Sequence, residues 1–184
     1  MRIVDLVAAD ERWMAQVGAL LRSVKPERNP MPVVWQSLAE GQYCRVTVDG
    51  ADRVSGWLWG RPLFEGESWE LKWLIVDPAL QRSGIGSALV RDFEAWCAAR
   101  GVLTIWLMTG EELGRTNLFG TDLFDRPLEK LQSLELLADH PIRFYQSLGY
   151  QIIGVIPDAN GMGCPEYLMG KSLFRERKQG NSPG

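Results

Sequence analysis

The run Gln81-Arg82-Ser83-Gly84-Ile85-Gly86 combines residue types and a spacing that can bind a phosphate group. It follows the apolar segment 71–76 and opens a stretch with helical periodicity, 87–100. A strand, a glycine turn and a helix N-terminus in this order leave backbone N–H groups free and direct the positive end of the helix dipole to one point. Gly84 and Gly86 have no Cβ, so a phosphate can approach the backbone. The run therefore predicts a site for the pyrophosphate of a nucleotide-like cofactor.

The spacing of the two glycines differs from that of the common phosphate-binding motifs. A P-loop has four residues between its glycines and then Lys-Ser/Thr, and a dinucleotide-binding turn has a third glycine and a downstream acidic residue. Neither pattern is present. Gln-x-x-Gly-x-Gly after an apolar strand instead resembles the acyl-CoA signature of the GNAT superfamily of N-acetyltransferases. The alternative is a helix that simply begins with glycine.

A second motif, Pro141-Ile-Arg-Phe-Tyr-Gln-Ser-Leu-Gly149-Tyr, resembles the short helix and turn that follow in this superfamily. Asp139 or His140 can cap the helix, Pro141 suits its first position, and Gly149 suits the position after its end. The two motifs lie about sixty residues apart, as the resemblance implies. Together the matched segments cover roughly residues 55–172.

The resemblance implies acetyl-CoA as co-substrate and no metal. In the superfamily the strand at 71–76 carries a bulge and lies beside the pantetheine arm. A backbone N–H near Leu74 would then polarise the thioester carbonyl, as in an oxyanion hole. The cofactor-binding residues implied in this way are Leu74, Ile75, Val76, Gln81, Arg82, Ser83, Gly84, Ile85, Gly86 and Ser87.

Glu70 is the candidate group for receiving the acceptor amine. Regular strand alternation places Trp69, Leu71, Trp73 and Ile75 on one face, and Glu70, Lys72, Leu74 and Val76 on the other. Glu70 would therefore face the same way as Leu74. A carboxylate there can hold an ammonium and pass its proton to water. The alternative is a solvent-facing glutamate near the start of a strand.

Tyr145 is the candidate for stabilising the leaving thiolate. A phenol has a reference pKa of about 10, so it stays protonated at neutral pH and can donate. Members of the superfamily often place a tyrosine here, and the alternative is an aromatic packing residue. His140, which stands next to a helix start, is better explained as a cap or a structural hydrogen bonder than as a base.

The second half of the chain resembles a narrower group, the enterococcal-type aminoglycoside 6'-N-acetyltransferases. The matching segments are 69–71 (WEL), 114–118 (GRTNL), 121–125 (TDLFD), 138–141 (ADHP), 156–161 (IPDANG) and 165–169 (PEYLM). The acceptor implied is a primary amine of a polycationic aminosugar, which an acidic loop can attract. Substrate-binding candidates are Trp69, Glu70, Lys72, Asp122, Asp125 and Asp139.

The sequence also departs from this group. Lys72 stands where the resembled enzymes carry His, and Trp73 stands where they carry Pro; the first sixty residues match poorly. A cation at Lys72 opposes a cationic acceptor. Two alternatives therefore stay open: acetylation of another small amine, such as a polyamine or peptide, and a regulatory acyl-CoA-binding module without transfer activity.

The elements that must position these residues follow from periodicity and turn residues. We expect helices at 10–23, 32–40, 87–100, 127–137 and 141–147. We expect strands at 1–5, 43–48, 54–60, 69–76, 103–108 and 150–157. The resemblance implies an α/β (α+β) fold with a mixed, mostly antiparallel central sheet, splayed at the acetyl-CoA strand and flanked by helices. We expect a single domain over 1–174 and a disordered tail over 175–184.

Bulk properties restrict the remaining possibilities. The net charge of −3 disfavours nucleic-acid binding. No apolar run approaches membrane length, and acidic residues interrupt any N-terminal signal sequence. Cys44, Cys97 and Cys164 are odd in number and have no metal-binding spacing, which predicts reduced thiols in a cytoplasmic protein. The family resemblance implies a homodimer.

Overall fold

The computed structural model describes residues 1–174, which form two compact units. The first unit comprises Met1–Leu103 and the chain from Leu173, and the second comprises Thr104–Ser172. The described residues contain seven strands and five α-helices, and every strand pair within a unit is antiparallel. The predicted α/β class with a mostly antiparallel sheet is confirmed. The single domain and the splay stay predictions, and the tail at 175–184 lies outside the described residues.

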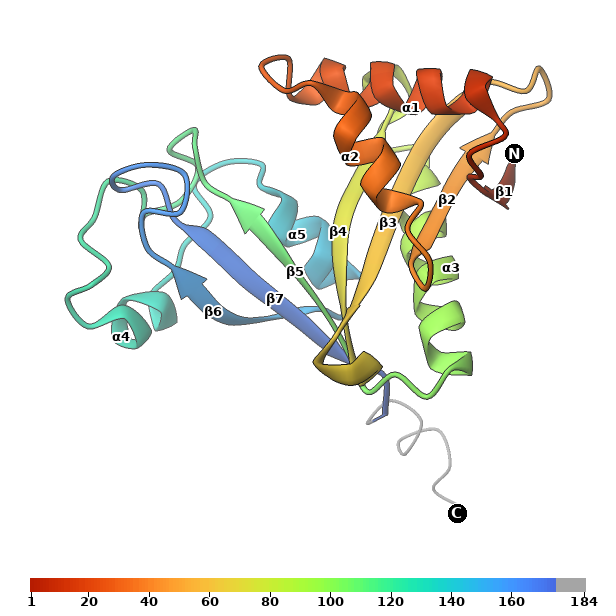
Figure 1. Cartoon of the computed structure of the whole chain (residues 1–184). Coiled ribbons are helices and arrows are strands. Elements are labelled where there is room, and N and C mark those ends of the chain that lie inside the picture. The colour runs from red at the N-terminus through yellow and green to blue at the C-terminus, as the bar shows by residue number, and fades with distance from the viewer. Residues whose placement is uncertain (175–184) are drawn as a thin grey trace. The chain divides into compact units, whose positions relative to one another are not determined.

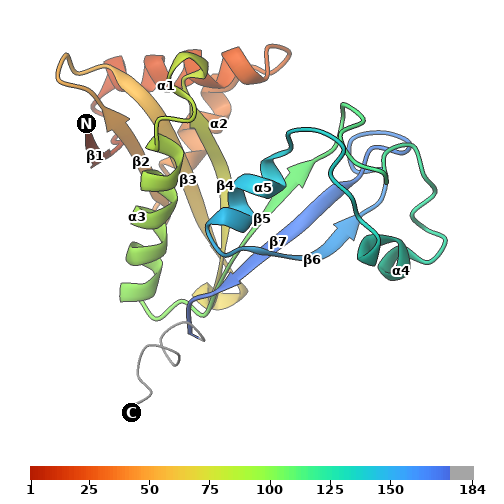
Figure 2. The same cartoon turned by 180° about the vertical axis from the view of Figure 1, so that it is seen from behind.

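The first unit is an antiparallel ladder with helices on both faces. Its strands, in spatial order, are β1 (Arg2–Asp5), β2 (Tyr43–Val48), β3 (Val54–Leu63) and β4 (Ser68–Val76). Its helices are α1 (Glu11–Val24), α2 (Pro30–Ser37) and α3 (Ile85–Ala99), and the short 3₁₀ turns η1 (Phe64–Gly66) and η2 (Pro78–Leu80) flank β4. Helices α1 and α2 lie on one face of β2–β4 and α3 lies on the other (Figures 1 and 2).

Helix α3 is held close to the sheet by a glycine, a hydrogen bond and an ion pair. A Cβ at Gly60 would overlap the Phe93 ring, so this residue lets the helix pack directly against β3. Asp92 accepts hydrogen bonds from the Tyr43 hydroxyl and from Arg45 Nη1, the latter at 2.8 Å. These contacts fix the helix that begins at the predicted phosphate loop.

Strand β4 carries a bulge at Lys72. Trp59 pairs with Trp73 and Gly60 pairs with Leu71, so Lys72 has no partner on β3. An extra residue in one strand of a pair breaks the alternation of side chains between the two faces. The bulge implied by the family resemblance is therefore present, on the β3 side of the strand.

The bulge makes the predicted face assignment wrong. Trp69 packs against Phe93 and Trp96 of α3, whereas Trp73 and Ile75 pack into the core under α1 and α2. These three residues were expected to share one face. The strand changes face at Lys72, so a single alternation cannot describe both of its ends.

The second unit contains three strands in the order β5–β7–β6 and two short helices. The strands are β5 (Thr104–Gly110), β6 (Gln151–Ile156) and β7 (Glu166–Ser172), and the helices are α4 (Pro127–Gln132) and α5 (Pro141–Ser147). Strand β7 is absent from the predicted order of elements, although it pairs on both sides. Pairing of this kind overrides the weak β-propensity of a segment with Gly170 and Lys171.

Helix α4 ends earlier than expected. Asn117 contacts the chain after it, donating from Nδ2 to the Ser133 carbonyl and accepting at Oδ1 from the Glu135 N–H. Thr116 and Leu136 then form an isolated antiparallel bridge. These bonds tie the chain at 133–136 to residues 116 and 117, and the helix ends at Gln132. No helix within residues 1–174 has both the length and the apolar character needed to span a membrane.

Candidate active site

The predicted phosphate loop has the local structure that its sequence indicates. Strand β4 ends at Val76, η2 follows, and α3 begins at Ile85 directly after Gly84, whose φ is 89°. The Ser83 hydroxyl donates to the Leu80 carbonyl at 2.5 Å, which closes the turn. Residues 81–84 are exposed. A helix start of this kind presents unpaired N–H groups to the surface, as an anion site requires.

Glycine was predicted at position 84 for its missing Cβ, and the structure adds a second reason, a left-handed backbone conformation. A positive φ is strained for other residues, and a Cβ there would meet no atom within 4 Å. Arg82 also has a positive φ, of 62°. Gln81 Nε2 lies 3.4 Å from the Val76 carbonyl, so this side chain contacts the end of β4. Backbone strain in the loop is typical of a ligand-binding turn.

Glu70 is buried rather than solvent-facing, with 1% of its side chain exposed. Arg61 Nε donates to its Oε2 atom at 2.5 Å, and Lys72 Nζ donates to its Oε1 atom at 3.1 Å. One carboxylate thus lies between two cations, and the cluster carries a net charge of +1. A buried carboxylate is stable in its charged form only when paired in this way.

Arg61 was missed by the sequence analysis. It lies directly opposite Glu70 on β3, in the part of the ladder next to η1. Extending the antiparallel pairing outward from the turn at Phe64–Gly66 would have placed the two residues together. The Arg61–Glu70 pair could therefore have been predicted from the position of the turn. The bulge lies farther from the turn than this pair and does not change its register.

The other predicted residues of β4 are divided between its two faces. Leu74 pairs with Leu58, which shares the α3 face with Gly60, whereas Glu70 pairs with Arg61 on the opposite face. Glu70 and Leu74 therefore do not point the same way, contrary to the expectation from alternation. Trp69 is buried against α3, with 4.8 Å between its ring centroid and that of Trp96.

Tyr145 lies on α5 in the second unit and is buried. Its ring makes edge contacts with Phe144 and Tyr150, with centroid distances of 5.0 and 5.7 Å. Burial raises the pKa of the Tyr145 phenol well above its ordinary value. The hydroxyl is therefore protonated at neutral pH, which is the form that can donate to a thiolate.

His140 is the N-cap of α5, one of the two predicted caps. Its Nδ1 accepts from the Ile142 N–H at 3.2 Å, and its Nε2 lies 3.2 Å from the Gly110 carbonyl. Burial, followed by the charge of Arg115, lowers the pKa of His140. A neutral imidazole with its proton on Nε2 satisfies both contacts. The structural interpretation of His140 is confirmed by this geometry.

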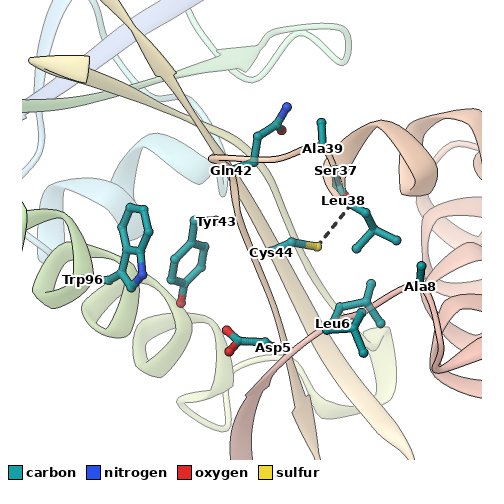
Figure 3. Close-up of a pocket in the computed structure, with 11 residues that line it drawn as sticks. Asp5, Leu6, Ala8, Ser37, Leu38, Ala39, Gln42, Tyr43, Cys44 and Trp96 are labelled. Atoms are coloured by element: carbon teal, nitrogen blue, oxygen red, sulfur yellow. Dashed lines mark hydrogen bonds between the residues drawn. The ribbon is translucent and has the colours of Figure 1, made fainter. Parts of the chain in front are cut away.

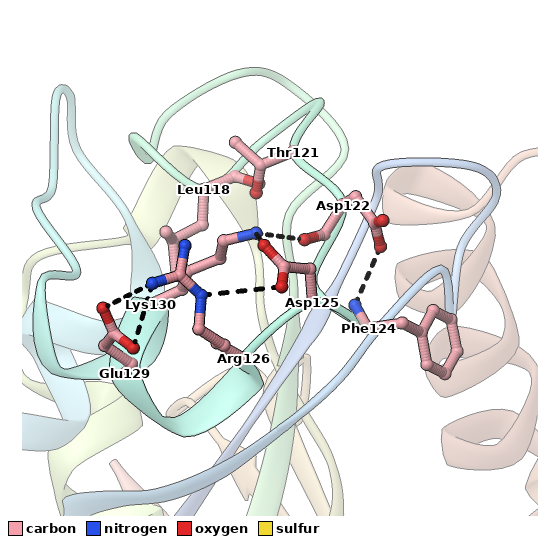
Figure 4. Close-up of polar contacts among 8 residues, drawn as sticks. All are labelled: Leu118, Thr121, Asp122, Phe124, Asp125, Arg126, Glu129 and Lys130. Atoms are coloured by element: carbon pink, nitrogen blue, oxygen red, sulfur yellow. Dashed lines mark hydrogen bonds and ion pairs between the residues drawn. The ribbon is translucent and has the colours of Figure 1, made fainter.

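The acidic residues after β5 contact nearby cations and backbone groups (Figure 4). Asp125 pairs with Lys130 at 3.2 Å and with Arg126 at 3.5 Å. The Asp122 carboxylate accepts from the Phe124 N–H at 2.9 Å, and its backbone carbonyl accepts from Lys130. Part of the negative charge predicted to attract a polycation is thus balanced locally.

Two other acidic positions differ in their surroundings. Asp139 lies beside the cap, and its carbonyl accepts from Arg115 Nη1 at 3.1 Å. Glu111 is fully buried. Burial acts to raise the pKa of Glu111, but N–H donors from Leu113 and Arg115 outweigh it and the pKa is lowered. Glu111 therefore stabilises the loop that follows β5 by accepting hydrogen bonds from its backbone.

The predicted site residues divide between the two units. The first unit holds Trp69, Glu70, Lys72, Leu74, Ile75, Val76 and the loop 81–87. The second holds Asp122, Asp125, Asp139 and Tyr145. Glu70 and Lys72 are in contact, and Asp122 and Asp125 both contact Lys130.

A cavity of about 280 Å³ in the first unit contains none of these residues. It lies where β1 ends beside β2, and Figure 3 shows Tyr43, Cys44 and Trp96 among the side chains that line it. The Cys44 thiol lies 3.2 Å from the Ser37 hydroxyl, and burial raises its pKa. The cavity is therefore separate from the predicted chemistry of β4 and the phosphate loop.

Comparisons with known proteins identify the family of the chain. Residues 11–119 match the acetyltransferase (GNAT) family. An aminoglycoside 6'-N-acetyltransferase solved with coenzyme A is 32% identical, with a TM-score of 0.88 over 94% of this chain and 97% of that chain. The aminoglycoside 6'-N-acetyltransferase from Enterococcus faecium is also 32% identical, with a TM-score of 0.86 over the same shares.

A third structure, an aminoglycoside 6'-acetyltransferase type Ii, is 28% identical, with a TM-score of 0.72, and covers 94% of this chain and 97% of that chain. The search among curated proteins finds no match. The family match covers more than half of the sequence, and the relatives at 32% identity span nearly all of it. The chain therefore belongs to the GNAT family of acetyltransferases.

Proposed function

We propose that the enzyme transfers the acetyl group of acetyl-CoA to the 6'-amino group of an aminoglycoside and thereby confers resistance to it. The observation that carries the proposal is the 32% identity to two aminoglycoside 6'-N-acetyltransferases over 94% of the chain. The transfer is direct, within a ternary complex of enzyme, acetyl-CoA and amine.

The cofactor half of the site lies on β4 and the loop that follows it. The pyrophosphate binds the backbone N–H groups of 82–87, with further contacts from the side chains of Gln81 and Arg82. The pantetheine arm pairs with backbone groups of 74–76. The Leu74 N–H polarises the thioester carbonyl, and such a prepositioned donor is worth about 3–4 kcal/mol in transition-state stabilisation.

Proton transfer is assigned to Glu70 and Tyr145. Glu70 accepts the proton of the acceptor ammonium, so that a neutral amine attacks the carbonyl carbon. Tyr145 donates to the CoA thiolate as the carbon–sulfur bond breaks. The buried, paired carboxylate and the protonated phenol support these two roles. Lys72, Asp122, Asp125 and Asp139 complete the proposed acceptor-binding set, whereas Trp69, predicted as part of it, is buried against α3 and is left out of the proposal.

Two observations favour a second candidate, the acetylation of a less cationic amine such as a peptide or metabolite. The Glu70 cluster carries a net positive charge, and Asp125 is paired within its own loop. Either feature weakens the attraction of a polycation. The physical contrast between the two candidates is therefore the charge that surrounds the reacting amine.

A thiol-release assay distinguishes the candidates. Acetyl-CoA is supplied with kanamycin-type aminoglycosides, spermidine or peptide amines, and the product position is read by NMR. The proposal predicts the highest kcat/KM with an aminoglycoside and a 6'-acetyl product. Turnover confined to spermidine or a peptide amine would reject the aminoglycoside assignment and leave the acetyltransferase activity in place.

The assembly and location of the enzyme are further parts of the proposal. We place it in the cytoplasm as a homodimer. The three cysteines carry free thiols, as expected in a reducing compartment. Sedimentation analysis of the full chain tests the dimer, and a monomer at micromolar concentration would exclude it.

A further inference from the structure

The amine of Lys72 occupies the position that the proposed mechanism reserves for the acceptor. Its Nζ lies 3.1 Å from Glu70 Oε1, while Arg61 holds Oε2 from the other side at 2.5 Å. Glu70 is the group assigned to remove a proton from a primary ammonium. The protein's own primary ammonium is therefore already bound to that base.

The bulge gives Lys72 freedom that a regular strand residue lacks. Lys72 has no pairing partner on β3, and 28% of its side chain is exposed. The Leu74 N–H, proposed to polarise the thioester, belongs to the same strand two residues beyond the bulge. Lysine has a flexible four-carbon stem, so its Nζ is not confined to one position.

We propose that the enzyme acetylates its own Lys72 when acetyl-CoA is bound and no acceptor is present. The inference rests on the proposed roles of acetyl-CoA and Glu70. The Lys72 ammonium loses a proton to Glu70, and the neutral nitrogen attacks the thioester carbonyl carbon. The carbon–sulfur bond breaks and CoA leaves as a thiol after taking up a proton. The products are Nε-acetyl-Lys72, free CoA and one proton released to water.

Acetylation of Lys72 changes the charge of the cluster. Before the reaction Arg61 and Lys72 surround one carboxylate, and the net charge is +1. Afterwards Arg61 and Glu70 balance each other, and Glu70 Oε1 has lost its ammonium partner. The modified site can then take an external ammonium in place of Lys72. The reaction thus converts a site that repels a cationic acceptor into one that binds it.

The first test uses full-length protein and acetyl-CoA without any acceptor. Peptide mass spectrometry should show acetylation of Lys72 with a first-order rate that is independent of protein concentration, because the reaction is intramolecular. Lys130 is the internal control, since it also pairs with a carboxylate, at 3.2 Å. The proposal is overturned if Lys72 is modified no faster than Lys130, or no faster than in the denatured chain.

Two variants assign the reaction to Glu70 and to Lys72. Glu70→Gln should abolish the modification while CoA still binds, which calorimetry verifies in the same preparation. Lys72→Arg retains the cation and should show no gain in intact mass. An acetyl group that still appears on Lys72 in a CoA-binding Glu70→Gln variant would exclude Glu70 as the base and overturn the proposal.

Kinetics with an aminoglycoside as acceptor distinguish the self-acetylation proposal from the proposed aminoglycoside activity. Lys72→Gln imitates the acetylated side chain and should lower the KM for a kanamycin-type aminoglycoside several-fold relative to Lys72→Arg. Rapid self-acetylation without turnover of any aminoglycoside would reject the substrate assignment and support self-acetylation. Turnover of aminoglycosides by a protein whose Lys72 stays unmodified would support the substrate assignment and reject self-acetylation.

Discussion

At the scale of single residues, the chemistry proposed for this acetyltransferase depends on how Glu70 and Tyr145 are surrounded. Glu70 is buried between Arg61 and Lys72, and Tyr145 is buried among aromatic rings. The same burial has different consequences for a carboxylate and a phenol. The Glu70 carboxylate is paired with two cations, whereas burial raises the pKa of the Tyr145 phenol.

Glu70→Gln should lower kcat/KM for the acceptor by about 10²- to 10⁴-fold, the range typical of a lost general base. CoA affinity should be unchanged, because the proposed cofactor contacts lie on 74–76 and 81–87. Initial-rate kinetics and calorimetry measure the two quantities. A fully active Glu70→Gln enzyme would remove Glu70 from the mechanism.

Tyr145→Phe should lower turnover by about 10- to 10³-fold while CoA binding and stability change little. The substitution removes only the hydroxyl, so the ring contacts with Phe144 and Tyr150 remain. Single-turnover measurements isolate the chemical step from product release. If the rate is unaffected, Tyr145 is a packing residue and water protonates the thiolate.

At the scale of the elements, the two ends of the proposed reaction depend on two helix N-termini. Helix α3 begins at the exposed phosphate loop, and α5, which carries Tyr145, begins at the His140 cap. Both starts were predicted from sequence, because caps, glycine turns and N-terminal prolines are local signals. Neither prediction required knowledge of distant contacts.

Gly86→Val should weaken CoA binding severely, because a branched side chain in the first turn of α3 obstructs the approach of a pyrophosphate to the backbone. Calorimetry with CoA measures the loss, and circular dichroism verifies that the variant is folded. Leu89→Val is a matched control in the buried part of the same helix, where CoA affinity should be retained. Unchanged CoA affinity in a folded Gly86→Val protein would place the pyrophosphate elsewhere.

Stability should decrease as the pH falls below about 6.5, the ordinary pKa of histidine. The lowered pKa of His140 means that the unfolded chain binds a proton which the folded chain resists, so protonation favours unfolding. Protonated Nδ1 also cannot accept from Ile142. Stability stops decreasing from this cause once the pH is below the pKa of His140 in the folded protein. Arg115 opposes the imidazolium, while Glu111 and Asp139 favour it.

His140→Asn provides the comparison for this pH dependence. Asparagine is a good N-cap but does not titrate. Denaturant unfolding between pH 7.5 and 5 should show a shallower decrease in stability for the variant than for the wild type. The lowered pKa of Glu111 places its own effect at more acidic pH. Equal pH slopes in the two proteins would mean that His140 does not titrate in this range.

At the scale of the whole molecule, local signals were predictable and contacts set by register were not. The phosphate loop, the His140 cap and most elements follow from turn residues and periodicity. The Arg61–Glu70 pair depends on the β3–β4 register, and the faces of β4 depend on a bulge that has no mark in the sequence. Strand β7 likewise depends on its partners on both sides.

The bulge has a consequence for how this strand tolerates the loss of a residue. Deleting one residue from a regular buried strand reverses every side chain beyond the deletion. Deleting Lys72 would leave the side chains beyond it on their present faces. Leu71 and Trp73 already lie on opposite faces, so joining them produces an uninterrupted ladder. The shortened chain should keep its melting temperature within a few degrees and lose acetyl transfer. Deletion of Leu107 from β5, whose pairing with β7 has no bulge, should reverse the side chains beyond it and unfold the second unit. Thermal melts of the two deletions beside acetylation assays would test the contrast.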